Sequence, residues 1–350
     1  MKIHQTYSMR YWACMHKISG LAATDLLNIL APHHSDLPRS SSTLMKTPLM
    51  SSFNIIKLQN GDFCYFGVEK QLLSFFSRYL IVPNKILYLK FNIDGPPLFK
   101  SSKIQFWPIL IQVNNCIVTD LIVVGMFCGT SKPFPIEDFL ANFVSELVKL
   151  LDVGLVFNKK RIDVKLLSII CDAPARAYLK CIKGHNGYSS CVKCICYGTY
   201  DHDGRVVVLD DLNARKRCNT SFRNQTDAEH HMGTSPFLAL EIDLVEDFPL
   251  DYMHCVCLGV MRKLLNFWMG GRVPVKLDSR TVNEISSRLI SFKPYFSKEF
   301  GRKPRGLDCL DRWKATEYRT FLLYAGPVTL LNLIPTAVYE HFVFFCYIWQ

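Results

Sequence analysis

The sequence predicts an α/β fold built on a central sheet, because strand-like and helix-like segments follow one another in a recognisable order. Three segments, 85–93, 106–113 and 121–128, are apolar or alternate apolar with polar residues, as β-strands do. A segment with apolar residues at helical spacing, 136–151, separates them from a fourth apolar strand, 164–170. This order predicts an antiparallel meander followed by a crossover that returns the fourth strand beside the first.

RNase H-like domains share this order of elements, so we predict an RNase H-like core interrupted by a mainly helical insertion. Apolar patterns at 8–32 and 68–80 predict helices before the core, and a helical pattern at 313–324 follows the insertion. The predicted parts are an N-terminal mainly helical region at 1–82, the first part of the core at 83–183, the insertion at 184–307, and a C-terminal helical part of the core at 308–350.

The overall charge leaves two interpretations open. The 41 Lys and Arg residues exceed the 30 Asp and Glu residues and give a formal net charge of +11. Such an excess favours a polyanionic partner, since neutralising phosphates releases counterions. A basic protein without such a partner fits equally well. No apolar segment is long enough to cross a bilayer, so we expect no membrane partner.

Cysteine usage indicates a reducing compartment. The 14 cysteines are spread along the chain, and no secretory signal opens it. Free thiols are therefore expected, and close cysteine pairs are interpreted first as metal ligands.

Two aspartates are the first candidates for chemistry. Asp94 follows the first predicted strand and Asp172 follows the fourth. If these strands are neighbours, both carboxylates lie at one end of the sheet and can hold Mg²⁺ or Mn²⁺, which prefer hard oxygen ligands. A two-metal site activates the attacking water or 3′-hydroxyl and stabilises the leaving oxygen of a phosphodiester. The alternative is that each aspartate only ends a strand or caps a helix.

Glu317 is the third acidic candidate, on the helix predicted after the insertion. It can complete a carboxylate triad, although a helical glutamate is usually a solvated surface residue. Basic residues surround it and form a candidate phosphate-facing surface, with a plain solvated face as the alternative. They are Arg302, Lys303, Arg305, Arg312, Lys314 and Arg319.

A CxxC motif, Cys191 with Cys194, indicates a structural zinc site. Zinc needs about four ligands, and His254 and then His231 are the preferred histidines. Asp251 either binds the metal or orients His254 from behind. A redox dithiol is the alternative for the cysteine pair, and a buried hydrogen-bonded histidine is the alternative for each imidazole.

With these motifs placed, the chain resembles DNA transposases of the CACTA/Mirage/Chapaev group, especially the animal En/Spm-like proteins. The matching segments are NIDGPPLFKSSKIQFWPIL at 92–110, CDAPARAYLKCIKGHNGYSSCVKC at 171–194, SFRNQTDAEHHMG at 221–233, FPLDYMHCVCLGVMRKLL at 248–265 and RWKATEYRTFLLYAGP at 312–327. The similarity extends from about residue 45 to residue 350.

The resemblance implies a DDE-type transposase core with Asp94, Asp172 and Glu317 as the metal-binding triad. It also implies Mg²⁺-dependent cleavage and strand transfer on double-stranded DNA, in the nucleus, by a homo-oligomer. The family's CxxC and D-x-x-H motifs fall on Cys191 with Cys194 and on Asp251 with His254. No recognisable DNA-binding module precedes the core, and related proteins continue beyond Glu317. We therefore expect a truncated chain, either active or a decayed or domesticated remnant that binds without cleaving.

Overall fold

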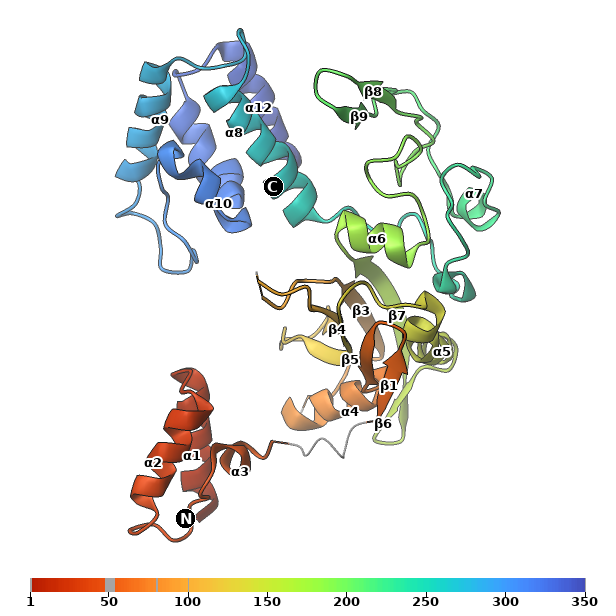
Figure 1. Cartoon of the computed structure of the whole chain (residues 1–350), viewed down its shortest axis with the longest axis vertical. Helices are drawn as coiled ribbons and strands as arrows, with labels where there is room; N and C mark the ends of the chain where they lie inside the picture. The colour runs from red at the N-terminus through yellow and green to blue at the C-terminus, as the bar shows by residue number, and fades with distance from the viewer. Residues whose placement is uncertain (1, 48–53, 80, 100, 350) are drawn as a thin grey trace. The chain divides into compact units, whose positions relative to one another are not determined.

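A computed structural model describes residues 2–47, 54–79, 81–99 and 101–349 (Figure 1). The chain divides into two compact units, Met1–Ile56 and Lys57–Gln350, each with its own internal contacts.

The first unit is helical, as the apolar pattern at 8–32 predicts. Its three helices are α1 (Lys2–Met15), α2 (Gly20–Leu30) and α3 (Ser41–Met45). Ser19 caps α2 by accepting a hydrogen bond from the Ala22 amide at 3.2 Å, which explains why the pattern breaks into two helices at this point. Leu27 of α2 and Leu44 of α3 are buried and pin the two helices together.

The second unit contains a seven-stranded mixed sheet in the order β1-β2-β5-β4-β3-β7-β6. Its strands are β1 (Ile55–Leu58), β2 (Gly61–Tyr65), β3 (Ile86–Ile93), β4 (Gln105–Val113), β5 (Ile122–Gly129), β6 (Leu155–Phe157) and β7 (Lys160–Ile170). β3, β4 and β5 form an antiparallel meander, and β7 lies parallel to β3. The predicted meander and crossover are confirmed. The hairpin of β1 and β2 was not predicted, and it joins the sheet beside β5.

Two helices pack on the sheet through their apolar faces. The crossover helix α5 (Ile136–Val153) buries Phe139, Phe143 and Leu147, and the Phe143 ring lies 5.1 Å from Phe91 of β3. α4 (Val68–Tyr79) was predicted over 68–80; Leu80 lies outside the described residues. A carboxylate from α5, that of Glu146, accepts the first free amides of α4 at 2.8 and 2.9 Å. Tertiary contact thus fixes where α4 begins.

The segment after α6 (Ala173–Leu179) was expected to be mainly helical, and its first half is mostly irregular instead. Its short elements are β8 (Thr199–Asp201), β9 (Val206–Val208), α7 (Asn219–Arg223) and η2 (Pro236–Ala239). Polar contacts hold it together: the Arg223 guanidinium donates to three backbone carbonyls, and Arg217 pairs with Asp227 at 2.6 Å. Cys, His, Gly and Asp dominate this segment, so it lacks the apolar period that a helix needs.

The rest of the chain is a helical body with its own core. Its elements are η3 (Met253–Met261), α8 (Arg262–Gly270), α9 (Ser279–Ser291), η4 (Leu307–Arg312), α10 (Ala315–Thr320), η5 (Phe321–Ala325), α11 (Gly326–Leu330) and α12 (Thr336–Ile348). Leu265, Leu289, Tyr318, Phe321 and Phe342 are buried in that core. Among the residues that the structure describes, no helix combines the length and apolarity that crossing a membrane requires.

Candidate active site

Asp94 and Asp172 end two neighbouring parallel strands. In the β3–β7 ladder Asn92 lies opposite Ile170, and the Asn92 side chain donates to the Ile170 carbonyl at 3.1 Å. Each aspartate follows two residues later, beyond the last residue of its strand, so both lie at the same end of the sheet. The prediction that their two strands are neighbours is confirmed.

Each carboxylate uses one oxygen to fix its own turn. Asp94 Oδ1 accepts from the Gly95 amide at 2.7 Å, and Asp172 Oδ1 accepts from the Ala175 amide at 2.7 Å and so caps α6. Position 95 has room only for glycine, because an added Cβ would lie 2.3 Å from the Trp107 ring. Asp172 therefore does cap a helix, as the alternative interpretation of this residue predicted. The capping hydrogen bond uses only Oδ1 of its carboxylate.

The charges at this edge repel one another. Burial, and then the negative charge of Asp172, raise the pKa of Asp94 above its ordinary value; a smaller contribution of the same sign comes from Asp251. The imidazole of His254 acts in the opposite direction on the same pKa. Asp251 and His254 are thus within electrostatic reach of Asp94, and they were expected at the zinc site instead.

Asp251 and His254 form a pair in the turn that leads into η3. The Asp251 carboxylate contacts His254 Nδ1, and its other oxygen accepts from the Met253 amide at 2.9 Å. This is the orienting geometry that the D-x-x-H spacing suggests, with Nε2 of His254 turned away from the contact. Asp251 is well shielded from solvent and His254 is exposed.

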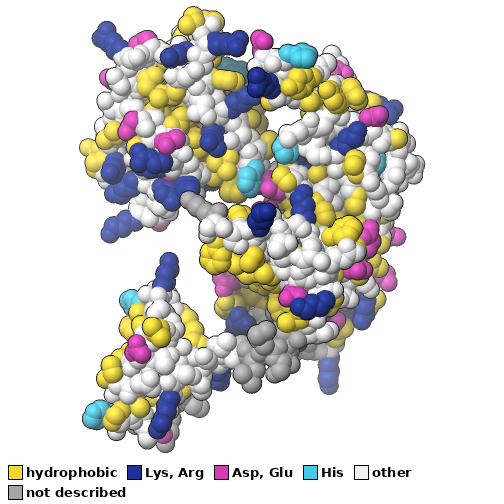
Figure 2. All heavy atoms as spheres, viewed as in Figure 1, with side chains coloured by type: hydrophobic (Ala, Val, Ile, Leu, Met, Phe, Trp, Pro, Cys, Tyr) yellow, Lys and Arg dark blue, Asp and Glu magenta, His cyan; other side chains and the backbone are white. Residues whose placement is uncertain are grey.

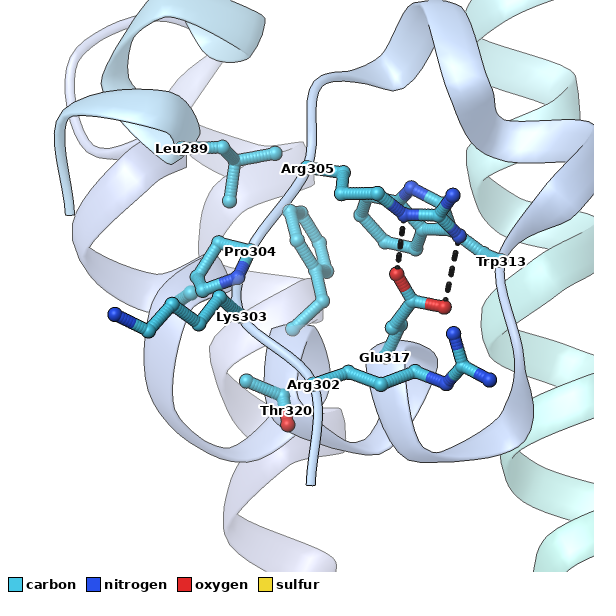
Figure 3. A pocket seen from close by; sticks show the side chains of 10 residues that line it. Leu289, Arg302, Lys303, Pro304, Arg305, Trp313, Glu317 and Thr320 are labelled. Carbon is cyan, nitrogen blue, oxygen red and sulfur yellow. Dashed lines mark hydrogen bonds and ion pairs between the residues drawn. The ribbon is translucent and has the colours of Figure 1, made fainter. Parts of the chain in front are cut away.

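Glu317 lies in the helical body, and Arg305 binds its carboxylate (Figure 3). The guanidinium makes two parallel contacts, Nε to Oε1 at 2.6 Å and Nη2 to Oε2 at 2.9 Å. Glu317 Oε2 also accepts from the Lys314 amide at 2.8 Å. Only 4% of the glutamate side chain is exposed, against 32% for Arg305. Both carboxylate oxygens are therefore already engaged within the helical body.

The other basic candidates remain at the surface. Arg302, Lys303, Arg312, Lys314 and Arg319 are exposed, whereas Arg305 is committed to Glu317. Figure 2 shows Lys and Arg side chains gathered on the helical body that carries α9 and α10. This surface is suited to contact phosphates, since exposed guanidinium and ammonium groups are the usual partners of a nucleic-acid backbone.

The two cysteines of the CxxC motif lie together. Their Sγ atoms are 3.2 Å apart, and the Arg217 guanidinium donates to the Cys191 carbonyl at 2.9 Å. Burial opposes the Cys191 thiolate, but hydrogen bonds from the Lys193 amide and the Cys194 thiol outweigh it and lower the pKa of Cys191. A thiolate at this position is the form that a metal binds.

The predicted histidine ligands are not gathered around these cysteines. The backbone of His231 forms an antiparallel β-bridge with Ile182, and the centroid of its ring lies 4.8 Å from that of Phe222. His254 lies with Asp251, as described above. Across the described parts of the chain, no three His, Cys, Asp or Glu side chains are close enough together to hold a metal ion. The sheet edge that follows β3 and β7 therefore carries two acidic residues, Asp94 and Asp172, and the described residues form a set of three ligands neither there nor at the CxxC motif.

One residue beside this edge carried no signal in the sequence analysis. Lys132, in the loop before α5, donates to the Pro174 carbonyl at 3.1 Å and lies over the Tyr178 ring at 5.5 Å. Burial lowers its pKa, while the charge of Asp172 acts to raise it. Its proximity to Asp172 arises from the crossover, so no local motif reveals it.

No protein-family model matches this chain, and the comparison with curated proteins finds no relative.

Proposed function

We propose that this chain is the nuclease core of a cut-and-paste DNA transposase of the CACTA (En/Spm-like) type, with an RNase H-like fold. The observation that carries the proposal is the placement of Asp94 and Asp172 at the ends of adjoining parallel strands. The order of the meander and crossover supports the RNase H-like assignment, and the excess of basic residues supports a DNA partner. The protein acts in the nucleus, on transposon ends and target, as a homo-oligomer.

The donor set at the sheet edge fits a divalent cation. Two hard carboxylates follow neighbouring strand ends there, and burial and then the charge of Asp172 raise the pKa of Asp94. When bound, Mg²⁺ or Mn²⁺ supplies the Lewis acidity that phosphodiester cleavage needs. Asp94 and Asp172 would hold the cation, and their hydrogen bonds from backbone amides keep both carboxylates in place.

Two residues compete for the role of third acidic ligand. Glu317 matches the family motif, but Arg305 and the Lys314 amide engage both of its oxygens. Asp251 is within electrostatic reach of Asp94 and is held by His254 and the Met253 amide. Comparing Asp251→Asn with Glu317→Gln in a cleavage assay separates the two, because only the metal ligand's loss abolishes cleavage in a folded protein.

A cleavage assay tests the proposed activity. Duplex DNA carrying transposon ends is incubated with Mg²⁺ or Mn²⁺, and nicked strands are resolved on denaturing gels. We expect Asp94→Ala and Asp172→Ala to abolish nicking. Asp163→Ala is the matched control, because this exposed aspartate lies on β7 at the opposite end from Asp172. Nicking that survives both substitutions at the sheet edge would exclude this site as the nuclease centre.

The second candidate is a catalytically inactive remnant that binds DNA or protein without cutting. The closed Arg305–Glu317 pair favours it, because the third carboxylate of the motif is unavailable while the pair persists. This function predicts DNA binding that Asp94→Ala leaves unchanged, together with no metal-dependent nicking by the unaltered chain.

We also propose a structural zinc ion on Cys191 and Cys194, the two predicted ligands that the structure places together. The lowered pKa of Cys191 supports a thiolate ligand there. The other predicted ligands, His254, His231 and Asp251, make different contacts in the described chain and are not gathered around the two cysteines.

A further inference from the structure

A cavity of about 860 Å³ opens beside α6, close to the catalytic edge. Four segments line it: the loop before α5 with the first residues of α5, the helix α6, the turn at 181–187, and the turn at 232–234. All of these residues belong to the second unit. The volume lies within the range of small-molecule pockets, roughly 300–1,000 Å³, and is far too small to admit a DNA duplex.

The cavity adjoins Asp172 through two of its lining residues. Pro174 follows Asp172 by two positions, and Lys132 donates to the Pro174 carbonyl at 3.1 Å. Burial lowers the pKa of Lys132, and the negative charge of Asp172 opposes this change, as a nearby carboxylate does. A ligand that occupies the cavity is therefore next to the carboxylates that we propose as the nuclease centre.

The cavity wall offers apolar and aromatic surface. Phe134 is 56% exposed in the free chain, although it belongs to the wall of a concave site. The Tyr178 ring is fixed edge-on against Trp107 at 5.3 Å and carries Lys132 Nζ over its face at 5.5 Å. Exposed aromatic rings beside a basic groove are the usual platforms on which unpaired bases stack.

Basic side chains outnumber acidic ones in the wall. Lys132, Lys183 and His185 line the cavity, against one acidic residue, Glu137. Lys183 pairs with Glu229 at 3.2 Å, a surface contact that a phosphate can replace. The wall thus combines stacking surface with groups that attract an anionic backbone.

We propose that this cavity holds one or two unpaired nucleotides of the DNA strand next to the phosphodiester at Asp94 and Asp172. Lys132 contacts the phosphate that links the cavity to the sheet edge, and Phe134 stacks on a base. This inference depends on the proposed function, because the ligand is a stretch of the same DNA substrate. It adds that the substrate is unpaired beside the cleavage point, as enzymes that extrude nucleotides require.

Binding measured without cleavage tests the cavity. Two fluorescent duplexes of the same length are compared, one fully paired and one with a central mismatched bubble of three nucleotides, in EDTA, by anisotropy. We expect Lys132→Ala and Phe134→Ala to weaken binding of the bubble duplex about tenfold each, the effect of losing one base-stacking or phosphate contact. Binding of the paired duplex should change less than about twofold.

Lys149→Ala is the matched control, since it removes the same charge from an exposed position on α5 outside the cavity. It should leave the preference for the bubble unchanged. Equal weakening of both duplexes by Lys132→Ala and Phe134→Ala, or an equal effect from Lys149→Ala, would overturn the cavity proposal. If Lys132→Ala does not fold, the cavity proposal is tested by Phe134→Ala and by photocrosslinking of an iodouracil placed in the bubble. Crosslinks at Phe134 or Tyr178 support the cavity proposal, and crosslinks confined to the 302–319 surface overturn it.

The two proposals fail differently. Failure of the unaltered chain to bind either duplex would contradict the DNA-directed function and the cavity with it. Selective binding of the bubble duplex that depends on Lys132, without any metal-dependent nicking, would contradict the nuclease function and still support the cavity as a binding site for unpaired nucleotides.

Discussion

Arg305 and Glu317 form a bidentate ion pair on the helical body, with contacts of 2.6 and 2.9 Å between guanidinium and carboxylate. The Arg305 side chain also donates to the Arg312 carbonyl at 2.8 Å, so one guanidinium ties the 302–312 loop to α10. The glutamate is almost fully buried. Buried charges of this kind are costly to leave unpaired, which gives the pair a structural role whether or not Glu317 also binds a metal.

Glu317→Gln should therefore lower the free energy of unfolding by about 2–3 kcal/mol, since charge-assisted hydrogen bonds are lost and Arg305 keeps an unpaired charge. Urea unfolding in the absence of divalent cations measures this. Glu284→Gln is the control, because Glu284 pairs with Arg288 at 3.2 Å on the exposed face of α9. That surface pair is worth about 0.5 kcal/mol or less. If the two variants lose the same stability, the Arg305–Glu317 pair contributes nothing beyond a surface contact.

Asp94→Asn should raise the stability of the metal-free chain at neutral pH. Burial and then the charge of Asp172 raise the pKa of Asp94 in the folded chain. Between the unfolded and the folded pKa, the folded chain therefore keeps a proton that the unfolded chain has released. That contribution is present below the unfolded pKa and is lost as the pH rises through the folded pKa. Above the unfolded pKa the raised folded pKa of Asp94 therefore costs stability, and the asparagine, which does not titrate, removes this cost.

The same variant should also lose its response to metal. Mn²⁺ or Mg²⁺ binding to the folded state raises the melting temperature of the unaltered chain by mass action, and Asp94→Asn should abolish that shift. Differential scanning fluorimetry with and without Mn²⁺ measures both effects, with Asp163→Asn as the control, on the strand that precedes Asp172. A Mn²⁺-induced shift that survives in Asp94→Asn would place the metal elsewhere.

Cys191→Ser should reduce zinc content and stability together. A structural zinc ion contributes its binding free energy to folding, so the loss of one thiolate removes the metal and part of the stability. Elemental analysis of the purified chain and thermal unfolding before and after chelation are the measurements. Cys14→Ser, at an exposed position in the first unit, should change neither. If the purified chain carries no zinc and chelation does not change its thermal unfolding, the close pair of Sγ atoms would instead be interpreted as a redox dithiol.

The sequence predicted the part of the fold in which local pattern and burial agree. In β3 every second residue is buried, and the apolar runs of β4, β5 and the second half of β7 were sufficient to predict these strands. The positions of Asp94 and Asp172 then followed from the order of the strands. The hairpin of β1 and β2 was missed although Asn60-Gly61, a favoured hairpin-turn dipeptide, marks it. Gly61 is also required by packing, since an added Cβ would lie 2.7 Å from the Gly129 backbone.

The contacts of Glu317 and Lys132 were beyond local prediction for a different reason. Arg305 reaches Glu317 across a loop and a short 3₁₀ turn, and nothing in the spacing of 12 residues distinguishes this arginine from the five other basic candidates. Lys132 meets α6 only because the crossover brings the two segments together. The helix around Glu317 was predicted over 313–324, and helical structure continues to Leu330 because Pro327 occupies the first turn of α11, where a missing amide costs nothing.

Lys180 gives a pH test of the insertion's packing. Its side chain is 1% exposed, lies over the Phe222 ring at 4.6 Å, and finds no hydrogen-bond acceptor for Nζ among the described residues. Burial lowers the pKa of Lys180 to about 7, so between this value and the unfolded pKa the unfolded chain binds more protons than the folded chain. Stability contributed through this group therefore increases as the pH rises from 7 toward 10, and the penalty of the buried charge is largest below pH 7.

Lys180→Met keeps the length of the side chain and removes the charge, so it should stabilise the chain at pH 7 by an amount on the order of 2–4 kcal/mol. The gain should shrink steadily at pH 8 and pH 9, because the unaltered lysine is then already neutral in the folded state. Urea unfolding of both proteins at the three pH values measures the difference between their free energies of unfolding. The titration of the cysteines affects both proteins equally, so it does not contribute to this difference. Lys149→Met, at an exposed site on α5, should show no such trend. A constant difference across the three pH values would mean that Lys180 is solvated in solution, and that the packing of Phe222 and Phe248 around it is looser than the structure shows.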